Sequence, residues 1–507
     1  MKQFIHQSIL LLLLHFLRLS GKSARFCLCF LLLCLWILST AIYLARAEEP
    51  LASLVLPNSL HVMISERHVV PLVAIDLWVQ AGAREEKATE FGSAHFLEHV
   101  LFKGTLLRPL GQTDIDIENL GGTLNAATGP DYTHFYTTVA ASKVPQALDI
   151  LADLVQNAAM PDAEVARERG VILDELAQHD SNATAHLIDL LYAKAFSTNA
   201  YGRSPGGSPE AISLRERDTL AAFYHRVYQP ERCTLVLAGD LTSSEAEHWT
   251  RRSFGAWHTY VVSKSGTVEN AAKNSIDKTN ENIRTSAITV PTLPSKSFTE
   301  FAAVPQALLG LAFPAPPARN YTMTTAALLA AEILGDRQQY GRLAAAKLTS
   351  SIASARFTPR RDSSLWIITA AQPDYDTYRI GQQEVGQDKK TQNESGIQRE
   401  EEALRNIVSG LSKSPPTSSE IRAAKLRLLG KMAADQDTCA GLASAIGYAE
   451  ITEGESPSLQ KAHIQHLPAS ELQQFIQLYL TQPGLCIRIK PSPVEAVRLK
   501  LIRVEAK

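Results

Sequence analysis

The sequence predicts an α+β fold with two domains of a homologous type, each a mostly antiparallel sheet covered by helices. Stretches with strand-like alternation and stretches with helical periodicity are intermixed along the chain without a strict β-α-β rhythm, which favours antiparallel sheets with helices on their faces. A polar segment rich in Ser, Thr, Asn and Lys separates two apolar regions of similar size. Such a segment is typical of an exposed linker, and the similar sizes suggest a duplication.

The first 47 residues differ in composition from the rest of the chain. They contain five basic and no acidic residues, and residues 26–45 form a nearly unbroken apolar run that ends in Ala45-Arg46-Ala47. This pattern predicts a secretory signal peptide with cleavage after Ala47. A run of about 20 apolar residues also suffices to span a bilayer, so an N-terminal membrane anchor is the alternative. Both place the remaining chain on the periplasmic or extracellular side.

The other 460 of the 507 residues carry 45 Lys and Arg against 52 Asp and Glu, a net charge of −7. This mildly acidic composition argues against nucleic acid as a partner. Cys233, Cys439 and Cys486 are scattered and show no C-x-x-C spacing, so we expect small buried hydrophobic residues rather than a disulfide framework. The expected domain ranges are 48–261 for the N-terminal domain, 262–302 for the polar linker and 303–507 for the C-terminal domain.

The elements expected in the first domain follow from local patterns. Strand-like stretches cover residues 54–80, and the turn at Asn58-Ser59 predicts a hairpin that opens a sheet. A Gly121-Gly122 turn leads into a strand–turn–strand unit around Gly129-Pro130-Asp131, and a further strand is expected at Cys233–Ala238. Helical periodicity predicts helices at 93–102, 113–120, 144–157 and 162–179.

The second domain is expected to contain strands and helices of the same kinds. The apolar patterns predict strands at Ala307–Phe313 and Ser364–Ala371 and helices at Thr324–Leu334, roughly 400–412 and 418–434. The polar stretch Gly386–Glu402 is predicted to be a mobile loop.

The stretch Gly92–Phe102 contains the pattern H-x-x-E-H. On a helix, residues four positions apart lie on one face, so His95 and His99 can offer two imidazoles to one metal ion. Glu98 lies at the edge of this face, where it can reach a metal-bound water without being a ligand. Catalytic zinc takes three protein ligands and one water, and a nearby carboxylate can accept the proton of that water. The pattern is the inverted zincin motif.

The third ligand has to come from another element, and the helix expected at 162–179 offers candidates. Glu168 and Glu175 are seven residues apart and therefore share one face of that helix. Val165, Ile172 and Leu176 form an apolar stripe beside them, where a lone carboxylate would be costly without a cation. The alternative is that both are solvated surface glutamates.

Three segments, 81–105, 117–136 and 167–176, together resemble the pitrilysin/insulinase family of zinc metallopeptidases. Within this family, the three segments most resemble the branch that contains the mitochondrial processing peptidase β subunit and its bacterial relatives. The resemblance covers most of residues 54–245 and weakens in 303–492. It implies that His95, His99 and Glu175 bind one Zn²⁺ per chain and that Glu98 is the general base. The implied activity is a zinc metalloendopeptidase that hydrolyses peptides or unfolded polypeptide segments.

The resemblance also implies roles for residues around the metal. Glu168 would be a carboxylate that helps to orient the ligands. Asn125 and Ala126 would lie on an edge strand that pairs with the backbone of the substrate. A catalytically silent peptide-binding or assembly subunit of a two-chain peptidase is the alternative function.

The second half contains no H-x-x-E-H pattern, and in the family this half usually closes the chamber without being catalytic. Many relatives have a substrate-binding Tyr there, whereas the corresponding stretch Lys347–Ile352 has Ser. Short family members enclose the chamber by pairing two chains. We therefore expect a homodimer, or a heterodimer with a related metal-free subunit.

Overall fold

The computed structural model describes residues 51–258, 260–262, 268–270, 292–371 except positions 303, 305, 337, 347 and 349–351, and 389–492. The predicted signal peptide or anchor at 1–47 and most of the linker predicted at 262–302 lie outside the described residues. None of the helices in the described ranges combines the length and the apolar character that crossing a bilayer demands.

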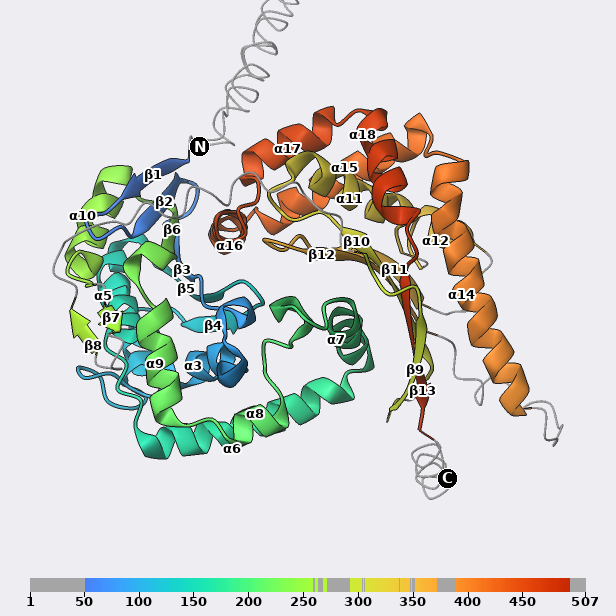
Figure 1. Cartoon of the computed structure of the whole chain (residues 1–507). Coiled ribbons are helices and arrows are strands. Elements are labelled where there is room, and N and C mark those ends of the chain that lie inside the picture. The colour runs from blue at the N-terminus through green and yellow to red at the C-terminus, as the bar shows by residue number, and fades with distance from the viewer. Residues whose placement is uncertain are drawn as a thin grey trace, which may run out of the picture. The chain divides into compact units, whose positions relative to one another are not determined.

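A six-stranded sheet forms the centre of the N-terminal half (Figure 1). The strand order is β1-β2-β6-β3-β5-β4, and every neighbouring pair is antiparallel except β2 and β6. The predicted hairpin is confirmed, with Ser59 in the turn between β1 and β2 at a φ of 73°. The strands are β1 (Ala52–Val55), β2 (His61–Glu66), β3 (Leu72–Val79), β4 (Asn125–Thr128), β5 (Thr133–Ala140) and β6 (Cys233–Gly239).

A five-stranded sheet forms the centre of the C-terminal half, with the strand order β11-β12-β10-β13-β9. Only β13 and β9 run parallel. The prediction of two mostly antiparallel sheets is therefore confirmed. The strands are β9 (Ser297–Ala302), β10 (Leu308–Ala315), β11 (Ile352–Phe357), β12 (Ser364–Ala371) and β13 (Leu485–Pro491), and a separate two-stranded ribbon consists of β7 (Tyr260–Val262) and β8 (Val268–Asn270).

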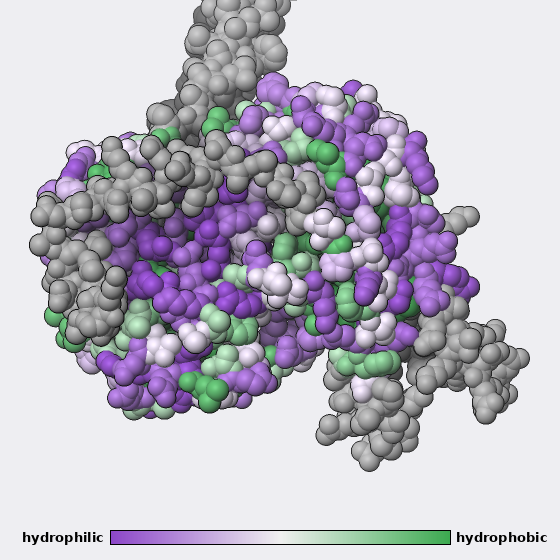
Figure 2. Space-filling model, viewed as in Figure 1, coloured by the Kyte–Doolittle hydropathy of each residue, from purple (hydrophilic) through white to green (hydrophobic). Residues whose placement is uncertain are grey.

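Helices surround both sheets, and the four helices predicted in the first domain are present with ends within two residues of those predicted. In the N-terminal half they are α3 (Ser93–Leu101), α4 (Gln112–Asn119), α5 (Val144–Gln156), α6 (Asp162–Ser181), α7 (Ala183–Ala195), α8 (Pro209–Ser213), α9 (Arg217–Val227) and α10 (Ser243–Phe254). In the C-terminal half they are α11 (Tyr321–Leu334), α12 (Gly341–Ala345), α14 (Lys389–Lys413), α15 (Ser418–Asp435), α16 (Cys439–Ile451), α17 (Pro457–His466) and α18 (Ala469–Phe475). On the face shown in Figure 2, hydrophobic residues form only scattered patches among hydrophilic ones, as expected when the larger apolar side chains fill the two cores.

Each sheet is covered in part by a helix from the other half of the chain. Helix α16 packs on β3 and β6, where Ala443 and Ile446 join Trp78 and Val236 in one apolar cluster. Helix α7 packs on β10 and β13 through a second cluster, which includes Leu187. Because each half supplies apolar side chains to the core of the other, the two halves depend on one another for burial.

Two predictions about polar segments are corrected. The stretch predicted as a mobile loop, Gly386–Glu402, is helical from Lys389 onwards, because Lys, Gln, Glu and Arg are good helix formers and because Leu404 and Val408 hold the helix in the core. The last six residues of the predicted linker form β9, which pairs with β13 and turns Phe298 towards the core. That end of the linker is therefore part of the second sheet.

Candidate zinc site

Helix α3 carries the H-x-x-E-H motif on the face that is turned away from the core. The helix begins after Gly92, whose φ of 83° is a left-handed conformation that favours glycine. His95, Glu98 and His99 are half-buried. The opposite face is anchored by the buried side chains of Ala94, Phe96, Leu97, Val100 and Leu101.

A buried carboxylate holds the start of this helix. Glu86 accepts a hydrogen bond from the backbone N–H of Gly92 at 3.0 Å and from that of Ala94 at 2.9 Å. N–H groups in the first turn of a helix have no partner within the helix, and a carboxylate there is also favoured by the helix dipole. Since Glu86 is only 4% exposed, burial raises its pKa to about 7, against the lowering effect of the two hydrogen bonds and of nearby arginines.

Helix α6 lies beside α3 and brings Glu175 to the two histidines. Oε2 of Glu175 is 3.3 Å from Nε2 of His99 and 3.8 Å from Nε2 of His95. One donor atom from each of the three residues lies within 4.8 Å of the others. Two imidazole nitrogens and one carboxylate oxygen are a donor set of catalytic zinc sites, in which water completes the coordination. The residues present therefore fit a zinc ion.

The two glutamates of α6 differ in their environments. Glu168 is buried, and its Oε2 lies 3.1 Å from Nδ1 of His99 while its Oε1 pairs with the ammonium of Lys103 at 3.1 Å. The side chain of Glu175 is 46% exposed. The alternative of two solvated surface glutamates is therefore wrong for Glu168, which bridges the helix α6 to a histidine and a lysine of the α3 region.

The state of the His95 ring suits a metal ligand. Burial and, to a smaller extent, the nearby His99 lower the pKa of His95 to about 4. The ring is therefore neutral at neutral pH, which is the form that binds metal. Its Nδ1 atom is buried and has no hydrogen-bond partner among the described residues.

Glu98 is fixed by a residue that the sequence did not single out. The hydroxyl of Thr128 donates a hydrogen bond to Oε2 of Glu98 at 2.5 Å. Burial raises the pKa of Glu98, and the hydrogen bond from Thr128 opposes this change. Thr128 is the last residue of β4, so the motif helix and the edge strand meet at Glu98. The only sequence signal for Thr128 is its position in the segment that also contains Asn125 and Ala126.

Strand β4 is at the edge of the six-stranded sheet, as predicted for Asn125 and Ala126. These residues pair with Tyr136 and Phe135 of β5 on one side, and no described strand pairs with β4 on the other. An edge strand presents unpaired backbone groups that an extended peptide can use.

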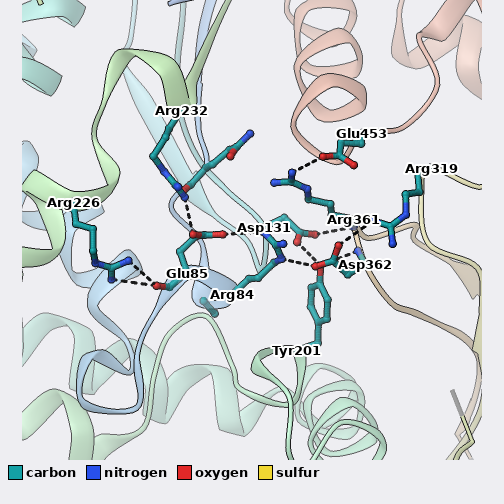
Figure 3. Close-up of polar contacts among 12 residues, drawn as sticks. Arg84, Glu85, Asp131, Tyr201, Arg226, Arg232, Arg319, Arg361, Asp362 and Glu453 are labelled. Carbon is teal, nitrogen blue, oxygen red and sulfur yellow. Dashed lines mark hydrogen bonds and ion pairs between the residues drawn. The ribbon is translucent and has the colours of Figure 1, made fainter. Parts of the chain in front are cut away.

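A polar network links the turn after β4 to the C-terminal half (Figure 3). The hydroxyl of Tyr201 donates to Oδ1 of Asp131 at 2.5 Å, and Oδ2 of Asp131 accepts a hydrogen bond from the backbone N–H of Arg361 at 3.2 Å. The Nε–H group of Arg84 donates a hydrogen bond to Oδ2 of Asp362 at 2.6 Å, within an ion pair. The loop between β11 and β12 is thereby held against the end of the strand that carries Thr128.

Comparisons with known proteins find relatives within one family of peptidases. Residues 61–207 match the family model described as insulinase (peptidase family M16), and residues 216–380 match the model of the peptidase M16 inactive domain. The β subunit of the mitochondrial-processing peptidase of Rattus norvegicus is 36% identical over 200 residues, which cover 39% of this chain and 41% of that protein. An uncharacterised zinc protease of Mycobacterium tuberculosis is 35% identical over 201 residues, which cover 40% of this chain and 46% of that protein. The matched regions span less than half the length of these curated relatives.

Solved structures share the fold at low sequence identity. A protease from Helicobacter pylori matches with a TM-score of 0.72 and 18% identity over 87% of this chain and 100% of that chain. The first half of the periplasmic protease PqqL from Escherichia coli matches with a TM-score of 0.65 and 19% identity over 89% of this chain and 93% of that chain. The two consecutive family matches and the sequence relatives show that the chain belongs to the insulinase family of peptidases, peptidase family M16.

Proposed function

We propose that this chain is a zinc-dependent endopeptidase that hydrolyses peptides or unfolded polypeptide segments. The observation that carries the proposal is the convergence of His95, His99 and Glu175 next to Glu98. Relatives named as a zinc protease and as a processing peptidase support it.

The proposed chemistry divides the work among these side chains. His95, His99 and Glu175 would hold one zinc ion, which when bound acidifies a water molecule and polarises the carbonyl of the peptide bond. Glu98 is held through Oε2 by Thr128, so Oε1 can accept a proton from the attacking water and pass it to the leaving amine. Glu168, at 3.1 Å from Nδ1 of His99, fixes the orientation of that ring with Nε2 towards the site.

The position of β4 at the edge of the sheet favours extended peptides as substrates. An extended peptide that adds beside β4 along Asn125 and Ala126 would be recognised mainly through its backbone. Such recognition requires an extended segment and tolerates many side chains. Peptides and unfolded segments therefore fit better than folded proteins.

We extend the proposal to assembly and location. Within the chain, 48–261 would be the catalytic domain, followed by a linker and a non-catalytic domain to 507. The named processing-peptidase relative is itself a β subunit, which supports a dimer with a second copy or with a related metal-free subunit. The periplasmic protease with the same fold supports export, through a signal peptide or an anchor at residues 1–47.

Turnover of an unstructured, internally quenched peptide tests the proposal. The purified chain, with any co-purifying subunit, should cleave the peptide, lose activity to a chelator and regain it on addition of zinc. The second candidate, a silent peptide-binding subunit, is favoured by the match of residues 216–380 to an inactive-domain model. Peptide binding without turnover at any zinc concentration would establish that candidate instead.

A further inference from the structure

A serine, a histidine and a glutamate form a hydrogen-bonded row at one edge of the six-stranded sheet. Oγ of Ser53 on β1 is 2.7 Å from Nε2 of His61 on β2. Nδ1 of the same ring is 3.1 Å from Oε1 of Glu450 on α16. Strand β1 is at one edge of the sheet, and β4, which meets Glu98, is at the other. The row is therefore separate from the candidate zinc ligands.

The register of the first hairpin explains why these side chains meet. His61 is the partner of Val55, which is two positions from Ser53 along β1. Because successive residues of a strand alternate between the two faces, Ser53 and His61 are diagonal neighbours on one face, close enough for an aromatic ring to reach across. Met63 on this face packs in the apolar cluster to which α16 contributes. This packing brings Glu450 beside the imidazole.

The two hydrogen bonds orient the imidazole of His61 as a general base. A carboxylate only accepts hydrogen bonds, so the proton of the neutral ring lies on Nδ1, next to Glu450. Nε2 then carries a lone pair that accepts a hydrogen bond from the hydroxyl of Ser53. The order of nucleophile, base and orienting carboxylate is that of the serine hydrolase triads. An adjacent base activates a serine hydroxyl, and Ser53 is exposed, so a substrate can reach its Oγ.

The edge position of β1 supplies a donor for the negative charge that develops in such a reaction. The backbone N–H of Leu56 donates to the carbonyl of Leu60 at 2.9 Å where the hairpin closes, and hydrogen-bonded and non-hydrogen-bonded pairs alternate from there. Ser53, three positions before Leu56, is therefore in a non-hydrogen-bonded pair, and its backbone N–H points to the edge. Among the described strands, none pairs with β1 on that side. The N–H of the nucleophilic serine is also a donor in the oxyanion hole of serine proteases.

We propose that Ser53, His61 and Glu450 form a second hydrolytic site, which cleaves small carboxylic esters. Oγ of Ser53 attacks the ester carbonyl while its proton passes to Nε2 of His61, and the alcohol leaves with that proton. A water molecule then gives a proton to His61 and attacks the acyl-serine, which releases the carboxylic acid as the proton returns to Oγ. Because the serine lies on an exposed strand and not in a cavity, we expect short acyl groups such as acetyl.

Hydrolysis of p-nitrophenyl acetate by the purified chain tests the activity. The rate should be unchanged by a chelator that abolishes peptide cleavage, because the row does not include the zinc ligands. Diisopropyl fluorophosphate, which phosphorylates activated serines with release of fluoride, should inactivate the ester hydrolysis. Mass spectrometry of the digested protein should place about one adduct per chain, on Ser53.

Variants then assign the roles. Ser53→Ala and His61→Gln should each lower the rate of ester hydrolysis by roughly a hundred-fold, and Glu450→Gln by roughly ten-fold or more. His68→Gln is the matched control, because His68 also pairs with a carboxylate, that of Asp240 at 2.7 Å, and its side chain is 46% exposed against 24% for His61. It should keep the wild-type rate, since the reaction depends on the serine row and not on any accessible imidazole.

The proposal fails if the chelator abolishes ester hydrolysis, or if the fluorophosphate adduct forms elsewhere than on Ser53. It also fails if Ser53→Ala hydrolyses the ester as fast as the wild type, or if His68→Gln loses as much activity as His61→Gln. The chelator and labelling experiments need only the wild-type chain, so they decide the matter even if a variant does not fold. They are also independent of whether the zinc site cleaves peptides.

Discussion

The carboxyl of Glu86, which holds the start of the motif helix, makes a quantitative prediction about stability and pH. Its pKa is about 7 in the folded protein against an ordinary value of 4.5. Between these two values the folded protein keeps a proton that the unfolded chain has released, so the free energy of unfolding falls as the pH rises through this window. At about 1.4 kcal/mol for each tenfold change in the proton equilibrium, the full loss is about 3 kcal/mol.

Glu86→Gln removes this titration while keeping the size of the side chain. The amide retains one oxygen for the N–H groups of Gly92 and Ala94, so the variant loses one of the two hydrogen bonds at every pH. The stability of the wild type relative to the variant should nevertheless fall by about 2 to 3 kcal/mol between about pH 5 and about pH 8. Urea unfolding of both proteins in the presence of a chelator measures this difference, and all other titrating groups cancel in the comparison.

The sign of the pH dependence is the informative result. A difference that stays constant between the two pH values would refute the argument that burial dominates the pKa of Glu86. A difference that grows with pH would show that the two backbone hydrogen bonds and the nearby Arg203 and Arg215 stabilise the carboxylate more than burial disfavours it.

Three further substitutions probe the surroundings of the site. Glu168→Gln should weaken zinc binding by roughly ten-fold to a hundred-fold, because the Glu168 carboxylate lies 3.1 Å from Nδ1 of His99. Competition with a chromophoric chelator measures the zinc affinity, and an unchanged affinity would show that Glu168 does not position His99. Thr128→Val should lower kcat roughly ten-fold or more with normal zinc content, because Glu98 loses its hydrogen bond. Thr128→Ser, which keeps the hydroxyl, should restore most of the rate, and equal rates for the two variants would contradict the role of this hydrogen bond. Gly447→Ala should lower the free energy of unfolding by about 1–3 kcal/mol, because the new Cβ would lie 2.0 Å from Nε1 of the buried Trp78. Urea unfolding measures this change, and a variant as stable as the wild type would show that α16 moves away from Trp78 at little cost.

Local patterns predict the site elements well where one helix or strand holds the information. The periodicity of 93–102 and 162–179 gave α3 and α6 almost to their ends, because each has one apolar face that must be buried. The spacing of Glu168 and Glu175 placed both on one face of α6, and the structure turns that face towards His99.

Contacts between distant segments could not be predicted in this way. Glu86 lies on no predicted element, and its role depends on how the turn before α3 folds back onto Gly92. Thr128 reaches Glu98 across 30 positions of sequence, and no periodic pattern reports such a contact. The exchange of α7 and α16 between the two sheets likewise depends on the tertiary packing of apolar faces that look ordinary in the sequence.

Polar segments misled the prediction for a related reason. The residues of 386–402 have the composition of a loop, but those from Lys389 form the first turns of a long helix that is anchored further along by Leu404 and Val408. Composition reports the exposure of a segment, and the packing of its continuation decides its conformation.

Cleavage by the Glu98→Gln variant, measured together with its zinc content, tests the central proposal most directly. The substitution keeps the size of the side chain and leaves His95, His99 and Glu175 in place, but an amide cannot accept the proton of the attacking water. We predict about one zinc per chain in both proteins and a loss of peptide turnover of at least about a hundred-fold in the variant. A zinc-loaded variant that cleaves the peptide as fast as the wild type would contradict the proposed mechanism.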